Sequence, residues 1–155
     1  MVDTASRKQG ETVASELRRA LGSFPAVPLL PGVAPRALLT DWVGSGHLPG
    51  GLELGEDCVL HSIADNAIAR ISGDDLRGEE VARHLEAGKQ VTRLGLSIND
   101  HLSFVLGEDL VVRRLKFLDT AMDQLPEDIE TVREELGARL ALAAGEVRGL
   151  FRVLD

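Results

Sequence analysis

Metal binding is the first chemistry to consider, because histidine, cysteine and carboxylate side chains are the usual metal ligands in proteins. The four histidines are scattered, and none pairs with another histidine or with the single cysteine at a ligand spacing; they are His47, His61, His84 and His101. A carboxylate-assisted site at Asp100 and His101 is the alternative, but both residues are more simply explained as turn residues. We therefore predict no metal and no cofactor.

Nucleophilic catalysis and nucleotide binding also lack a motif. Gly44-Ser45-Gly46 is too short for a Gly-x-Ser-x-Gly element. The glycine-rich run at residues 44–51 has no following Lys-Ser or Lys-Thr, so it does not form a phosphate loop. The carboxylates fall on predicted helix faces and turns, where solvated charges are usual. We predict that the chain is not an enzyme.

Phosphate binding by a mildly basic segment is the chemistry with a physical rationale. Residues 83–118 carry six basic and four acidic residues, and the segments on either side are acidic. The candidate DNA-binding residues are Lys89, Arg93, Arg113, Arg114 and Lys116. Such cations would contact phosphate oxygens without reading bases. The alternative is a set of solvated charges partnered by Glu86, Glu108 and Asp109.

Three strands must position these cations. Residues 90–98 alternate, with leucine and isoleucine on one face and Arg93 on the other, and Asn99-Asp100 is a turn signal. The alternation repeats over 102–106, and a second turn leads into 110–115. We predict an antiparallel meander. Stacking of single-stranded bases is not indicated, because only Phe104 and Phe117 are near and Phe104 alternates with core leucines.

The remaining elements are helices and short strands. We predict helices at 11–21, from Pro35 to Trp42, and at 79–87, and strands at 58–63 and 67–71. Residues 26–30 read as an edge strand, and 2–4 as the remnant of another. The glycine-rich run divides the chain into a region 1–46 and a domain 47–155 that contains the meander and the long terminal helix. The fold class is α+β.

A long helix is predicted at 127–153, with apolar residues at steps of three and four. This stripe is the second candidate site, an interaction surface formed by Leu136, Leu140, Val147 and Phe151. The alternative is that these residues belong to the core.

Composition limits the setting of the protein. The longest apolar runs fall short of the about 18 residues that a membrane span needs, and a single cysteine cannot form an internal disulfide. We predict a cytoplasmic protein without a membrane partner. The net charge of −8 taken alone argues against nucleic acid, so the distribution of the charges must carry that function.

Several strings in order along the chain resemble the RdgC family of bacterial recombination-associated proteins. Residues 21–29 (LGSFPAVPL) resemble the family's Leu-Gly-Ser-Leu-Pro-Val-Val-Pro-Leu, and 40–43 (TDWV) its Thr-Glu-Trp-Val. Residues 84–94 (HLEAGKQVTRL) match its His-x-Glu-Ala-Gly-Lys-x-Val-Thr-x-Leu element, and 102–106 and 113–119 follow in the same order. Residues 2–6 (VDTAS) resemble the family's entry to this region. The similarity covers nearly the whole chain.

The resemblance implies a sequence-independent, double-stranded DNA-binding protein that regulates RecA-dependent recombination. Members of the family form dimers that close into a ring around DNA, so a homodimer and a nucleoid-associated location are expected. Their chains are about twice as long, so the resemblance implies that this sequence corresponds to the C-terminal half, without the region through which the ring closes. Residues 1–46 would then be the remnant of a central domain, and 47–155 the C-terminal domain. Residues 72–76 (SGDDL) depart from the family's basic-basic-Gln-Asp-Leu, which weakens attraction for phosphate there.

Two functions therefore stay open. One is DNA binding by the basic segment, and the other is a dimerisation module that uses the helical stripe and does not itself bind DNA.

Overall fold

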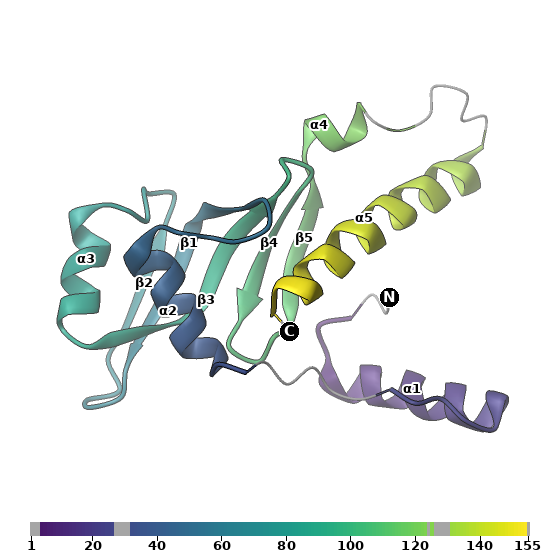
Figure 1. Ribbon diagram of the computed structural model, residues 1–155, viewed down its shortest axis with the longest axis horizontal. Helices are drawn as coiled ribbons and strands as arrows, with labels where there is room; N and C mark the ends of the chain where they lie inside the picture. Colours follow the sequence, from purple (N-terminus) through teal and green to yellow (C-terminus); the bar gives the residue numbers. More distant parts are fainter. Residues whose placement is uncertain (1–3, 27–31, 124, 126–130, 155) are drawn as a thin grey trace. The chain divides into compact units, whose positions relative to one another are not determined.

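The computed structural model describes residues 4–26, 32–123, 125 and 131–154, and its contacts divide the chain into two units, Met1–Leu30 and Pro31–Asp155 (Figure 1). The described residues form five helices and a five-stranded antiparallel sheet, so the predicted α+β class is confirmed. The strands predicted at 2–4 and 26–30 lie almost wholly outside the described residues.

The first unit contains helix α1, Arg7–Leu21. Ser6 caps its N-terminus by accepting a hydrogen bond from the backbone of Gln9, and Gly22 ends it in the left-handed conformation with a φ of 73°. The guanidinium of Arg18 then donates to the carbonyls of Phe24 and Ala26 at 3.2 and 3.3 Å, which holds the chain after the helix against it.

The second unit is built on the sheet, whose strands lie in the order β2-β1-β3-β4-β5. The strands are β1 (Leu52–Ser62), β2 (Ile68–Ser72), β3 (Lys89–Ile98), β4 (Leu102–Gly107) and β5 (Val112–Phe117). The last three form the predicted meander. β1 begins six residues earlier than predicted, because its first half continues to pair with β3 as far as Leu52 and Ile98.

One face of the sheet carries the core. Leu60 of β1, Leu94 of β3 and Leu106 of β4 are fully buried, and the residues at alternate positions of the same strands are on the other face. Two helices lie over the core face, α2 (Pro35–Ser45) and α5 (Val132–Leu154) (Figure 1). The core face of the sheet is therefore closed by helices from both ends of this unit.

Helix α2 is fixed to the sheet by its buried side chains and by one hydrogen bond to a strand. It buries Leu39, Trp42 and Val43, and the Thr40 hydroxyl accepts a hydrogen bond of 2.9 Å from the backbone of Val91. The predicted domain boundary after residue 46 stays a prediction, while the contacts group α2 with the sheet.

Two further helices complete the unit. Helix α3, Glu79–Glu86, buries Val81 and starts at Gly78 without a side-chain cap. Helix α4, Asp119–Met122, was not predicted. No helix among the described residues is both long and apolar enough to cross a membrane.

Candidate nucleic-acid interface

A hollow of about 220 Å³ lies on the face of the sheet opposite the helices. Four arginines line it, and they come from three strands: Arg70 of β2, Arg93 of β3, and Arg113 and Arg114 of β5. Among the lining residues, all in the described part of the chain, Asp57 is the one acid and none is aromatic. The hollow therefore has the composition of an anion site.

Strand pairing explains why these arginines converge. Val59 of β1 lies opposite Arg70 on one side and Arg93 on the other, and Val105 of β4 lies opposite Arg113. Neighbouring strands are about 4.8 Å apart, so cations on alternate strands are about 10 Å apart across the sheet. Val59 thus lies between Arg70 and Arg93, and Val105 lies beside Arg113, and these short side chains leave room for an anion above them.

A backbone irregularity brings Arg114 to the same surface as Arg113. Adjacent residues of a regular strand point to opposite faces, so two neighbouring arginines would normally be separated by the sheet. Here the register of β4 and β5 shifts between Ser103 and Val105, and Arg114 has a φ of 53°. This is a β-bulge, which redirects the side chain of the extra residue. Both arginines consequently line the hollow.

Arg113 is held by an ion pair. Its Nη1 donates to Asp109 Oδ1 at 2.9 Å, and its Nη2 pairs with Asp109 Oδ2. The hydrogen bond from Arg113 lowers the pKa of Asp109 below its ordinary value, and the same bond raises the pKa of Arg113. Part of the positive charge of Arg113 is therefore neutralised, in line with the alternative that Asp109 partners the basic segment.

The other predicted cations are placed in two ways. Lys116 of β5 is exposed opposite Ser103, on the same face as Arg113, so it extends the cationic surface beyond the hollow. Lys89 is not brought together with the others. Its Nζ donates to Nδ1 of His84 on α3 at 3.0 Å, and Lys89 does not line the hollow.

We did not predict Arg70 as a DNA-binding residue from the sequence, because residues 51–82 are acidic as a whole. The signal was present in the alternation of Ile68, Arg70 and Ser72 against Ala69 and Ile71, which puts Arg70 on the face away from the core. A turn at residues 63–65 joins β1 and β2 as a hairpin, in the register that brings Arg70 opposite Val59.

The layer beneath the hollow is apolar. Cys58 is 1% exposed, and burial raises the pKa of its thiol to about 12. Within the ranges that the structure describes, no group of three histidine, cysteine, aspartate or glutamate side chains is placed to hold a metal ion.

The stripe predicted on the long helix divides between two faces of α5. Ala143, Leu150 and Leu154 are buried beneath the helix. Leu136 and Leu140 are 60% and 55% exposed, Phe151 is also exposed, and Val147 is half-buried. The residues selected as an interaction surface are thus mostly on the outer side of α5.

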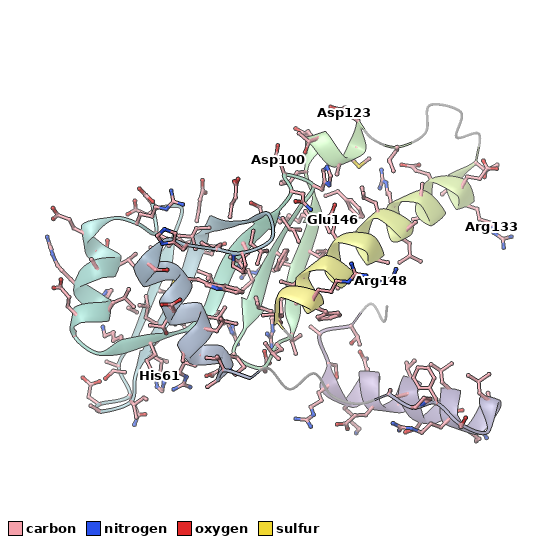
Figure 2. All side chains as sticks on the ribbon, viewed as in Figure 1. His61, Asp100, Asp123, Arg133, Glu146 and Arg148 are labelled. Carbon is pink, nitrogen blue, oxygen red and sulfur yellow. The ribbon has the colours of Figure 1, made fainter. Side chains whose placement is uncertain are left out.

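Glu146 joins the inner side of α5 to the turn between β3 and β4 (Figure 2). Its Oε2 accepts a hydrogen bond of 2.6 Å from Asn99 Nδ2, and its Oε1 lies 2.6 Å from His101 Nδ1. The side chains of His101 and Glu146 are only 17% and 13% exposed, so this contact fixes the helix at mid-length.

A sheet face with clustered arginines and no aromatic lining among the described residues is the kind of surface with which proteins contact a nucleic-acid backbone. The comparison with known families identifies the family of the chain. The family model described as "Putative exonuclease, RdgC" matches residues 1–155, and the chain belongs to the RdgC family.

Named relatives are similar over almost the whole chain. The recombination-associated protein RdgC of Xanthomonas campestris pv. campestris (strain B100) is 55% identical over 99% of this chain and 52% of its own. The proteins of the same name from Xanthomonas oryzae pv. oryzae (strain PXO99A) and Stenotrophomonas maltophilia (strain R551-3) are 53% and 50% identical over the same shares. The chain spans about half the length of these relatives, whose names describe recombination and not an enzymatic reaction.

Proposed function

We propose that this chain acts in DNA recombination by binding double-stranded DNA without sequence preference, through the open face of its sheet. The observation that carries the proposal is the convergence of Arg70, Arg93, Arg113 and Arg114 on one hollow of that face. Guanidinium groups bind phosphate oxygens in paired hydrogen bonds, and such contacts hold a duplex without reading its sequence.

The lining of the hollow favours the phosphate backbone over exposed bases. Proteins that bind single strands stack bases on aromatic side chains. Phe104 is 4% exposed on the core side of the sheet, and Phe117 is half-buried. The described part of the open face therefore supplies charge without a stacking platform.

The biological role follows from the same surface and from the names of the relatives. A protein that occupies duplex DNA without sequence preference would restrict the access of a recombinase such as RecA. We propose that the chain regulates RecA-dependent recombination in this way, on chromosomal DNA in the nucleoid.

Charge reversal at the bulge tests the proposal. The double variant Arg113→Glu/Arg114→Glu is expected to lose binding to a labelled random-sequence duplex in fluorescence anisotropy. The matched control, Arg7→Glu/Arg19→Glu, changes the net charge equally on α1, where both arginines are exposed. Equal losses in both variants would mean that net charge, and not the hollow, governs binding. Incubation of the duplex with Mg²⁺ and the chain, followed by electrophoresis, tests the exonuclease description.

A second function is favoured by the outer side of α5. We propose that a second copy of the chain packs on Val132, Leu136, Leu140 and Phe151, which are exposed in the single chain. A twofold pair of α5 helices would bring the same exposed apolar residues of both copies together, so the surface is complementary to itself.

A further inference from the structure

Asp57 places a negative charge inside the arginine hollow. It is the one acid among the lining residues, and its carboxylate Oδ2 lies 4.0 Å from Nη1 of Arg114. Asp109 also pairs with an arginine of the hollow but does not line it. Asp57 therefore differs from an ordinary surface counter-ion, because it occupies space that an incoming anion would use.

The backbone of β1 is shaped to hold Asp57 there. The register between β1 and β3 shifts between Leu54 and Cys58, so that Gly55, Glu56 and Asp57 bulge opposite the single residue Gly95. A Cβ atom at Gly95 would lie 3.1 Å from the Asp57 carbonyl oxygen, which is a tight contact, so the close approach of the strands favours glycine. The Asp57 side chain stays 44% exposed above this point.

Asp57 also interacts with donor groups that could bind a phosphate. The Ser72 hydroxyl donates a hydrogen bond to Asp57 Oδ1, and Ser72 lines the hollow together with Arg114. A phosphate group that entered the hollow would compete with the carboxylate for these donors and would be repelled by its charge.

We propose that Asp57 is a built-in competitor for phosphate, which limits how tightly the arginine hollow holds the DNA backbone. The inference rests on the proposed DNA-binding function and deepens it. Weaker binding of a phosphate suits a protein that must bind DNA of any sequence and also dissociate from it. Sequence-independent proteins slide and exchange on DNA when their phosphate contacts are individually labile.

The variant Asp57→Asn tests the inference, because it removes the charge and keeps an oxygen that can accept from Ser72. Unit charges about 4 Å apart in water change a binding constant about fivefold. We therefore expect Asp57→Asn to bind a random-sequence duplex about fivefold more tightly in anisotropy. If the asparagine variant does not fold, Asp57→Ser removes the same charge and is measured in its place, with circular dichroism to verify its folding.

The matched control is Glu53→Gln. Glu53 is an exposed acid on the same strand, opposite Ser97, and it does not line the hollow. We expect the affinity of Glu53→Gln for the duplex to stay within about twofold of the parent chain, because Glu53 does not touch the hollow and salt weakens the effect of charges at a distance. An equal gain in both variants, or weaker binding by Asp57→Asn, would overturn the inference.

Titration with inorganic phosphate separates this inference from the DNA-binding function. The arginine side-chain N–H signals are followed by NMR in the parent chain and in Asp57→Asn. Tighter phosphate binding by the variant supports the competitor role even if neither protein binds the duplex. Unchanged phosphate affinity in the variant overturns the role, whatever the duplex does.

Discussion

Single residues decide whether the basic segment forms a surface. Arg113 and Arg114 are neighbours in sequence, and only the left-handed backbone of Arg114 lets both line the hollow. The sequence predicted the residue types and the strands, but a bulge depends on how β4 and β5 register against each other. In the turn between the strands the Gly107 N–H donates to the Val111 carbonyl at 3.2 Å, but the register shifts further along, between Ser103 and Val105, so this pairing is not a property of a local pattern.

The ion pair of Arg113 predicts a pH dependence. The pKa of Asp109 is lowered in the folded protein, so the pair stabilises the fold above the ordinary value of 3.8, and this stabilisation is lost as pH falls through the lowered pKa. The carboxyl carbon of Asp109, followed by NMR, should titrate below the ordinary value. In Arg113→Gln the midpoint should rise, because the hydrogen bond that causes the shift is removed. An unchanged midpoint would contradict the ion pair.

The buried thiol predicts low reactivity. Burial raises the pKa of Cys58 to about 12, and the thiolate is the form that reacts with disulfide reagents. At pH 8 the native chain should react far more slowly than the same chain in denaturant, as measured by absorbance of the released thiol. Equal rates in both conditions would mean that Cys58 is accessible in the folded state.

At the scale of elements, strands and helices were predicted more reliably than the contacts between them. The alternation around Leu94 and Leu96 and the periodicity of the long helix are local signals, and the corresponding elements are present as β3 and α5. The division of the α5 stripe into a buried and an exposed side was not predictable, because it depends on which turn the helix meets. The contact of Glu146 with Asn99 and His101 sets that rotation.

Glu146 should therefore contribute to the stability of the second unit. The variant Glu146→Ala loses both hydrogen bonds from a poorly exposed position, which is expected to cost about 1.5–3 kcal/mol in the free energy of unfolding. Chemical denaturation measures this cost. Glu135→Ala is the control, since Glu135 pairs with Arg139 within α5 and its loss should cost about 0.5 kcal/mol or less. Equal costs would mean that the contact with the turn does not anchor the helix.

At the scale of the whole molecule, the net charge of −8 coexists with a cationic sheet face. The acids outnumber the bases along the chain, but strand pairing gathers four arginines on one side of the sheet. Total charge was thus a poor guide to the charge of this face, whereas the alternation of residues in each strand was a good one.

The outer side of α5 predicts concentration-dependent self-association. Sedimentation velocity should show a dimer that Leu140→Asp shifts toward monomer, because a charge would be buried against the second copy. Leu140 is 55% exposed in the single chain, so folding should survive the change. The matched control is Ile63→Asp, at an apolar position that is 65% exposed and lies between β1 and β2. A monomer at all concentrations would remove the second proposed function.

The salt dependence of duplex binding tests the central claim most directly. Each neutralised phosphate contributes about −0.9 to the slope of log affinity against log salt, so four or five cations predict a slope of roughly −4. Anisotropy titrations from low to moderate salt, with two unrelated duplex sequences, should give this slope and equal affinities. Absence of binding at low salt, or a slope near zero, would contradict the assignment of the open sheet face as the DNA-binding surface.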